Sequence, residues 1–127
     1  MKSDRFRTAA EGKDFSALDE LFSENVSFRS PAVFKPYEGR DQVAMILGTV
    51  VQVFEDFRYV DQVETGDTAV LVFKARVGDR ELDGVDILRF GHDGRIEELT
   101  VMVRPMSGLN ALADEMGARL TGAAGSG

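Results

Sequence analysis

Cysteine is absent from this 127-residue sequence, and histidine occurs once, at His92. Without cysteine, the chain cannot form disulfide bonds, thiolate nucleophiles or cysteine-based metal sites. A single histidine among scattered carboxylates lacks the ligand spacing of a metal centre, so we expect no metal and no other cofactor. Glycine-rich phosphate-binding loops are missing as well.

Long apolar runs and clustered basic residues are also missing. No segment approaches the ~20 apolar residues that a membrane helix needs, and the first residues lack the apolar centre of a secretory signal. We therefore expect a cytoplasmic protein with no membrane partner. The 15 Lys and Arg residues are scattered singly, and the formal net charge is −7. Because nucleic-acid binding needs clustered positive charge, we expect no nucleic-acid partner.

The remaining composition is that of a globular protein, with 43% hydrophobic and 29% charged residues. A chain of this length can bury a core as one domain. We predict a single domain over residues 1–116, ending in a helix that begins near Ser107. Residues 117–127 are expected to form a flexible tail, because the terminal sequence TGAAGSG has nothing to bury.

Helical spacing dominates the first half of the chain. The apolar residues predict a short helix over residues 4–11 and a second helix from Asp14 to Phe22. Alternation from Val26 to Ser30 predicts a strand with one buried face, followed by a proline-containing loop. The strongest helical period runs from Asp41 to Phe54, and its apolar stripe is expected to pack on a sheet.

From Phe57 onward the apolar period changes from 3.6 to 2, which is typical of strands. We predict four antiparallel strands, over residues 57–63, 69–77, 81–90 and 98–104. The first of these strands is expected to carry one inward row, made of Phe57, Tyr59, Asp61 and Val63. Helices followed by an antiparallel meander indicate an α+β fold with the helices on one face of the sheet.

The opposite face of this sheet is also partly apolar. It is expected to carry Val70, Val72, Val85, Ile87 and Met102. This is more apolar surface than a solvated face needs, and such patches often mark interfaces. We therefore predict a homodimer that forms through the open face of the sheet.

Asp86 is the candidate catalytic residue. It is the one ionisable side chain on an otherwise apolar inward row, which it shares with Leu88 and Phe90. Burial can raise a carboxyl pKa by up to ~3–5 units, which would let Asp86 donate a hydrogen bond or act as an acid/base group. The alternative is a structural role, in which a Tyr or Arg neighbour satisfies the buried carboxyl group.

Six short motifs follow one another along the chain: Lys13-Asp14-Phe15, Leu21–Val26, Ser30-Pro31, Tyr37–Arg40, Val85–Phe90 and Asp93–Ile96. In this order and spacing they resemble the nuclear transport factor 2-like superfamily, which includes ketosteroid isomerase, limonene epoxide hydrolase and the SnoaL-like cyclases. The resemblance implies a cone-shaped α+β fold. In that fold, N-terminal helices pack on a curved antiparallel sheet and enclose an apolar pocket.

Ketosteroid isomerase combines a carboxylate base, a tyrosine and a protonated aspartic acid. The resemblance implies that Asp86 matches the protonated aspartic acid, Ser30 the base and Phe6 the tyrosine. Serine is not a base near neutral pH without help, and phenylalanine has no donor. Limonene epoxide hydrolase has a carboxylate at about the position of Val101, where this chain is apolar.

Two hypotheses about function follow. In the first, the protein binds a small apolar molecule, carbonyl-bearing or cyclic, in the pocket. In the second, it is an isomerase- or cyclase-type enzyme in which Asp86 is the acid/base group or the oxyanion donor. The substitutions at the base and tyrosine positions favour binding, and the retained Asp86 favours catalysis. The predicted ligand-binding residues are Phe6, Phe28, Ser30, Tyr37, Tyr59, Leu88 and Val101.

Overall fold

A curved six-stranded sheet is the frame of the molecule in the computed structural model, which describes residues 1–125. Its strands are β1 (Phe22–Arg29), β2 (Tyr37–Glu38), β3 (Glu55–Thr65), β4 (Thr68–Val77), β5 (Arg80–Phe90) and β6 (Ile96–Arg104). Their order in the sheet is β2-β1-β6-β5-β4-β3. All neighbours are antiparallel except β1 and β6, which are parallel. The four strands predicted after Phe57 are therefore present as β3 to β6.

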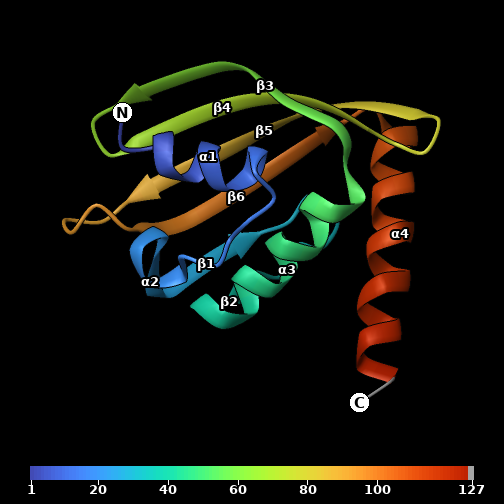
Figure 1. Cartoon of the computed structure of the whole chain (residues 1–127), viewed down its shortest axis with the longest axis horizontal. Coiled ribbons are helices and arrows are strands. Elements are labelled where there is room, and N and C mark those ends of the chain that lie inside the picture. The colour runs from blue at the N-terminus through green and yellow to red at the C-terminus, as the bar shows by residue number, and fades with distance from the viewer. Residues whose placement is uncertain (126–127) are drawn as a thin grey trace.

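The helices within residues 1–125 are α1 (Asp4–Glu11), α2 (Leu18–Leu21), α3 (Arg40–Val53) and α4 (Met106–Gly125). Figure 1 shows the sheet arching over α1 and α3, while α4 descends beside α3 from one end of the sheet. The apolar core lies between the helices and the concave face. This architecture confirms the predicted α+β cone. No helix in the described part of the chain is both long and apolar enough to cross a membrane.

Helix α3 forms where the sequence predicts it, within one residue at each end. Gly39 precedes it with a φ of 96°, a left-handed conformation that glycine adopts without steric cost and that turns the chain into the helix. The face with Val43, Ile46 and Leu47 is buried. This apolar stripe anchors α3 to the core and leaves its polar side in solvent.

The second helix, predicted from Asp14 to Phe22, is wrong at both ends, because residues 14–17 are not helical and Phe22 lies in a strand. Helix α2 is only four residues long, and Phe22 begins β1 instead of ending a helix. Phe22 pairs with Ile96 in the parallel β1–β6 ladder and is fully buried. Its ring stacks on that of Phe15 at a centroid distance of 6.2 Å. Strand pairing and aromatic packing therefore outweigh the local helical spacing, as tertiary context commonly does.

The predicted inward row of β3 is correct only as far as Tyr59. The register with β4 shifts between Tyr59 and Asp61, so Asp61 lies opposite Val72 on the outer face. Gln62 takes the inward position opposite Leu71 and donates a 2.7 Å hydrogen bond to the Ser3 hydroxyl below α1. A β-bulge inserts one residue and reverses the facing of every residue after it, which the period-2 pattern alone did not predict.

The flexibility predicted for residues 117–127 stays a prediction. Residues 117–125 continue α4, which ends at Gly125, while residues 126 and 127 lie outside the described part of the chain. Leu120 extends the apolar stripe that begins at Leu109, because it lies at position i+11 of the same helical face. This side chain helps to line the interior of the molecule, so the helix has a packing reason to continue past Met116.

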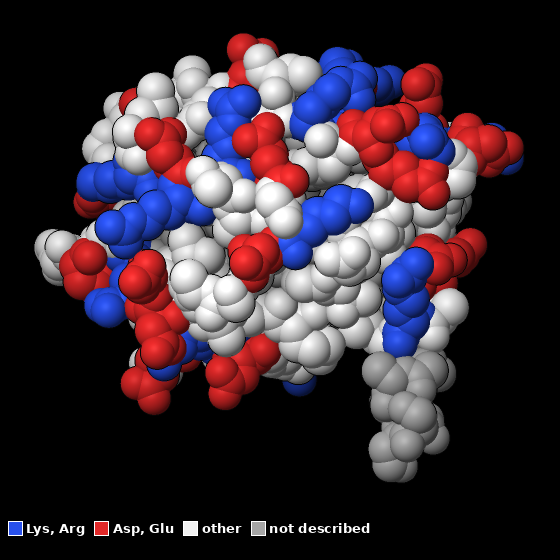
Figure 2. Space-filling model, in the orientation of Figure 1, with Lys and Arg blue, Asp and Glu red and all other residues white. Residues whose placement is uncertain are grey.

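The outer face of the sheet has the apolar character that the sequence predicts. Val70, Val72, Val85 and Ile87 are half-buried there, and Met102 is 56% exposed. The bulge in β3 adds Val63, which is 62% exposed and lies opposite Val70. From the side seen in Figure 2, basic and acidic residues are intermixed, and the surface over α3 toward α4 carries few charges.

Candidate functional site

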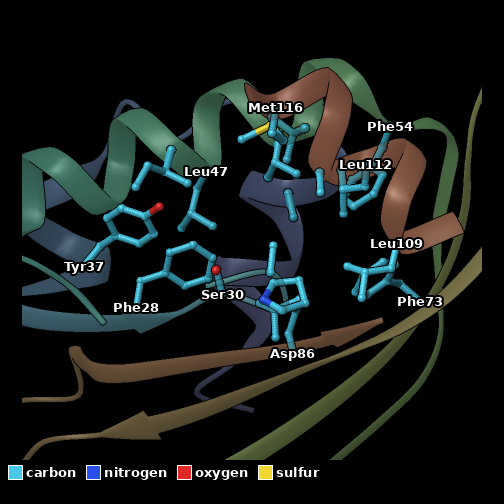
Figure 3. A pocket seen from close by; sticks show the side chains of 18 of the residues that line it. Phe28, Ser30, Tyr37, Leu47, Phe54, Phe73, Asp86, Leu109, Leu112 and Met116 are labelled. Atoms are coloured by element: carbon cyan, nitrogen blue, oxygen red, sulfur yellow. The ribbon is translucent and has the colours of Figure 1, made fainter. Parts of the chain in front are cut away.

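An apolar cavity of about 220 Å³ lies between the concave face of the sheet and helices α1, α3 and α4. Its walls include Ala10 of α1, Ile46, Leu47, Val50 and Val51 of α3, Phe57 of β3 and Phe73 of β4. Figure 3 shows Tyr37 and Phe28 at one end, Phe54 and Phe73 at the other, and Asp86 on the sheet between them. Asp86 is the one acidic or basic residue among the described residues that line this cavity.

Most of the predicted site residues lie together in the cavity wall. These are Phe6, Phe28, Ser30, Tyr37, Tyr59, Asp86 and Val101. Leu88 is the exception, because it lies one step farther along β5, between Ala69 and Leu99, and is fully buried in the core. We therefore do not retain Leu88 as a ligand-binding residue. The ligand-binding roles of the others stay predictions.

Helix α4 supplies a wall that the sequence reasoning missed. Its lining residues are Leu109, Leu112, Ala113, Met116, Gly117 and Leu120. They follow the spacing i, i+3, i+4, i+7, i+8 and i+11, which is that of one helical face. The helical spacing of apolar residues was therefore present in the sequence, but the glycine-rich end of the chain favoured the prediction of a flexible tail. Figure 3 shows α4 closing the side of the cavity opposite the sheet, with Leu112 and Met116 directed inward.

Asp86 and Tyr59 form a buried pair on the cavity wall. The Tyr59 hydroxyl donates a 2.6 Å hydrogen bond to Oδ2 of Asp86. Both residues are 6% exposed. Asp86 faces inward because it lies opposite Leu71 of β4 and Val101 of β6, both on the concave side. Tyr59 is the last inward residue of β3 before the bulge. Its side chain reaches Asp86 diagonally across β4, because Tyr59 pairs with Phe73 and Asp86 pairs with Leu71.

Burial sets the protonation of this pair. Desolvation raises the pKa of Asp86 from 3.8 to about 7, and the hydrogen bond from Tyr59 partly opposes that rise. The pKa of Tyr59 is raised as well, by burial and then by the negative charge of Asp86, so the phenol keeps its proton. Asp86 is therefore a carboxyl group that changes charge near neutral pH, next to a fixed hydrogen-bond donor.

The second carboxyl oxygen of Asp86 is directed to the cavity. No described residue hydrogen-bonds to Oδ1, and Tyr59 is the partner of Oδ2. Yet no fully buried side-chain oxygen or nitrogen in the described residues lacks a partner. Oδ1 therefore keeps some accessible surface, and that surface belongs to the cavity that Asp86 lines. A molecule in the cavity can form a hydrogen bond with this atom.

Aromatic side chains hold Tyr59 in place. Its ring meets Phe57 edge-on at 5.0 Å between centroids and Phe73 edge-on at 6.2 Å. The guanidinium of Arg7 lies 5.7 Å from the ring centroid, within the range of a cation–π contact. Gly84 makes room for this cluster, because a Cβ there would lie 2.1 Å from the Phe73 ring. The phenol is thus oriented toward Asp86 before any ligand arrives.

Ser30 and Phe6, at the implied base and tyrosine positions, do not supply those groups. The Ser30 hydroxyl accepts a 3.0 Å hydrogen bond from the Val33 backbone N–H, so it holds the loop after β1. Arg29 pairs with Thr100 of β6, so the next residue, Ser30, lies beside Val101. Val101 in turn pairs with Asp86 of β5. The backbones of Ser30 and Asp86 are therefore two strand spacings apart, ~10 Å. Phe6 packs on Phe15 and contributes only an apolar surface.

No group of three or more His, Asp or Glu side chains within residues 1–125 is arranged to hold a metal ion. The polar side chains that line the cavity are Ser30, Tyr37, Tyr59 and Asp86. The chemistry that this site can perform with its own residues is therefore limited to hydrogen bonding and to proton transfer at Asp86.

Solved structures with the same architecture include close relatives. A steroid delta-isomerase from Pseudomonas aeruginosa is 48% identical, with a TM-score of 0.93 over 98% of this chain and 92% of that one. A bacterial protein with a cystatin-like fold from Silicibacter pomeroyi is 35% identical, with a TM-score of 0.91 over 94% and 85% of the two chains. An NTF2-like protein from Mesorhizobium loti shares the fold at 21% identity and a TM-score of 0.73, over 82% of this chain and 88% of that one.

No curated protein matches the sequence. Residues 4–99 match the SnoaL-like domain, a span that runs from α1 into β6 and includes both members of the Tyr59–Asp86 pair. These matches confirm the resemblance to the nuclear transport factor 2-like superfamily. Helix α4 lies beyond the matched span. The chain belongs to the SnoaL-like domain family.

Proposed function

We propose that this protein binds a small, mainly apolar cyclic molecule that carries a carbonyl group, with Asp86 as the polar anchor. The proposal rests on the different surroundings of the two oxygens of the Asp86 carboxyl group. Oδ2 is held by Tyr59 at 2.6 Å, and Oδ1 reaches an otherwise apolar cavity. A ligand group that hydrogen-bonds to Oδ1 replaces water there and gains about 0.5–1.5 kcal/mol, the net contribution of a typical hydrogen bond.

The protonated form of Asp86 suits a carbonyl oxygen. Tyr59 donates to Oδ2, so the carboxyl proton resides on Oδ1 and can be donated to an acceptor in the cavity. With a pKa of about 7, Asp86 holds this proton below neutral pH and is half protonated near pH 7. A carboxylate on Oδ1 would instead repel a carbonyl oxygen. Binding of a ketone should therefore weaken as the pH rises above about 7.

The size of the cavity limits the ligand. A cavity of ~150 Å³ accommodates benzene, and pockets for drug-sized molecules begin near ~300 Å³. The cavity of this protein, about 220 Å³, lies between those sizes. A ligand with one or two rings fits this volume. Aromatic side chains at both ends favour a flat ring body.

Paired ligands test the proposal. Tetralin and 2-tetralone differ in one carbonyl group, and their affinities would be measured by calorimetry from about pH 5 to about pH 9. We expect the wild type to prefer the ketone, with a preference that falls above about pH 7. Asp86→Asn keeps a neutral donor, so its preference should not depend on pH. Asp83→Asn, on the outer face of β5, is the matched control and should behave as the wild type.

The double variant Tyr59→Phe/Asp86→Leu tests the carboxyl group itself. Replacing both hydrogen-bonded partners with apolar groups leaves no buried polar atom unpaired, so the variant is expected to fold. It should bind tetralin and 2-tetralone with similar affinities. A ketone preference that survives in this variant would contradict the role of Asp86.

A second candidate function is proton transfer on the bound molecule. The 48% identity to a protein named as a steroid delta-isomerase favours it. In this mechanism the Asp86 carboxylate takes a proton from the carbon next to the ligand carbonyl and returns it to that enolate. Deuterium exchange of 2-tetralone in D₂O, followed by NMR, measures this step. Faster exchange with the wild type than with Asp86→Asn supports catalysis, and exchange at the solution rate supports binding alone.

We also propose that the outer sheet face forms a homodimer. Val63, Val70, Val72, Val85, Ile87 and Met102 give this face a continuous apolar centre across β3 to β6. A second copy of the chain presents the same surface, and two-fold pairing would remove both patches from water. The cavity lies on the opposite face, so such a dimer leaves it unobstructed.

A further inference from the structure

A second polar atom in the cavity has no protein partner. Tyr37 of β2 lines the cavity and is half-buried, and its hydroxyl makes no hydrogen bond to a described residue. Its ring stacks on Phe28 at 6.1 Å between centroids with a tilt of 23°, which fixes the direction of the side chain. Figure 3 shows the Tyr37 hydroxyl directed toward the interior of the cavity.

Tyr37 lies at one end of the cavity, and Asp86 lies on the sheet between its two ends (Figure 3). Tyr37 pairs with Phe28, Phe28 with Leu99, and Leu99 with Leu88 of β5, the strand that carries Asp86. Three strand spacings, ~14 Å, therefore separate the two backbones along the sheet. Both side chains line the same cavity on the concave face of the sheet.

The other polar atoms of the cavity wall are already used. The Ser30 hydroxyl accepts the Val33 N–H, and the Tyr59 hydroxyl donates to Asp86. Between the two free polar atoms the lining is apolar, with Leu47 of α3 and Val101 of β6 among its residues. The cavity therefore offers a ligand two hydrogen-bonding points separated by apolar surface.

We propose that the ligand is bifunctional, with one polar group at Asp86 Oδ1, a second at the Tyr37 hydroxyl, and an apolar ring body between them. This inference rests on the function proposed above and narrows its ligand class from cyclic carbonyl compounds in general to those with a second oxygen at the far end. A phenol both donates and accepts, so either a hydroxyl or a carbonyl oxygen suits the Tyr37 end. Two fixed points also give the ligand a single orientation in the cavity.

Two probes that differ in one hydroxyl group test the inference. They are 2-tetralone and 6-hydroxy-2-tetralone, in which the hydroxyl lies across the ring system from the ketone. Dissociation constants would be measured by calorimetry for the wild type and for Tyr37→Phe. This variant keeps the ring that stacks on Phe28 and removes only the hydroxyl. A thermal melt of each protein shows that the fold is intact.

We expect the hydroxylated probe to bind the wild type roughly tenfold more tightly than 2-tetralone, as one added hydrogen bond allows. In Tyr37→Phe this gain should disappear, while the affinity for 2-tetralone stays unchanged. A gain that persists in Tyr37→Phe, or no gain in the wild type, overturns the inference. In either case 2-tetralone still binds, so the proposed function stands. If neither probe binds the wild type, the proposed function fails and this inference fails with it.

Discussion

The Tyr59 hydroxyl and the Asp86 carboxyl group form a 2.6 Å hydrogen bond across two strand spacings of the sheet. The bond leaves one carboxyl oxygen for the cavity and holds the carboxyl group in a fixed orientation. It also joins two residues that the sequence separates by 27 positions. The geometry makes Tyr59 a positioning residue for Asp86, and this role can be tested independently of any ligand.

Removing the Tyr59 hydroxyl should raise the pKa of Asp86 above about 7, because the hydrogen bond from Tyr59 lowers it. Tyr59→Phe keeps the ring in its aromatic cluster and leaves Oδ2 without a partner. We expect the free energy of unfolding to fall by about 1–3 kcal/mol when the carboxyl group is charged. NMR titration of carbon-13-labelled aspartate carboxyl groups measures the pKa. A pKa that stays the same or falls would contradict the positioning role.

Asp86 should also make stability depend on pH. Its pKa in the folded protein, about 7, lies above the ordinary value of 3.8, so the folded state holds a proton that the unfolded chain releases in between. The stabilisation is complete below about pH 4 and is lost as the pH rises through about 7. The pKa difference corresponds to roughly 4 kcal/mol at most.

Denaturant unfolding of the wild type and of Asp86→Asn at several pH values measures this effect. The asparagine does not titrate, so the wild type should lose stability relative to the variant as the pH rises from about 4 to about 8. Subtracting the two curves removes the contribution of the exposed carboxylates that both proteins share. A difference that is independent of pH would mean that Asp86 is already ionised in the folded protein.

Gly117 should control the space inside the cavity. It lies in the middle of α4 and lines the cavity, and a Cβ at this position would meet no atom within 4 Å. Gly117→Ala should stabilise the protein by about 0.5–1 kcal/mol, because alanine favours a helix over glycine. Gly117→Leu should instead fill the cavity and weaken binding of 2-tetralone at least tenfold. Thermal melts and calorimetry separate the two effects.

Gly108 is the matched position on the same helix. A Cβ there would lie 2.8 Å from the Glu81 carbonyl oxygen and 2.8 Å from Leu82 Cβ, so Gly108→Ala should destabilise the first turn of α4. We expect a loss of about 1–3 kcal/mol from the overpacked contact. If Gly117→Ala were as destabilising as Gly108→Ala, the open space beside Gly117 would not exist.

The proposed dimer can be tested with two exposed methionines. Met102 is 56% exposed on the outer face of the sheet, and Met45 is 52% exposed on α3. Light scattering at micromolar concentration should give the mass of a dimer for the wild type and for Met45→Lys. Met102→Lys should shift the protein toward the monomer, because the interface would bury an unpaired charge. A wild-type monomer under these conditions would refute the dimer.

The periodicity of the sequence determined most of the fold. The 3.6-residue period located α3 and the 2-residue period located β3 to β6, because a buried face needs apolar residues at each repeat. The same alternation placed Asp86 on the inward row between apolar neighbours. These features depend on local spacing, which can be read along the chain.

Contacts between residues distant in sequence decided the features of the fold and the site that local spacing did not predict. The bulge after Tyr59 turned Asp61 outward, and pairing with Ile96 drew Phe22 into a strand. The same kind of long-range contact paired Tyr59 with Asp86. None of these outcomes follows from local spacing, because each depends on the register of strands or elements that are far apart in sequence.

Helix α4 depends both on local apolar spacing and on contacts with distant elements. The spacing from Leu109 to Leu120 already contained its apolar face, but only the sheet and α3 give that face something to cover. The cavity exists because these elements meet around it. The sequence by itself therefore determined the inward rows of β4 to β6, including Asp86. Only the tertiary structure decided that Tyr59 holds one oxygen of Asp86 and that the other faces an enclosed apolar space.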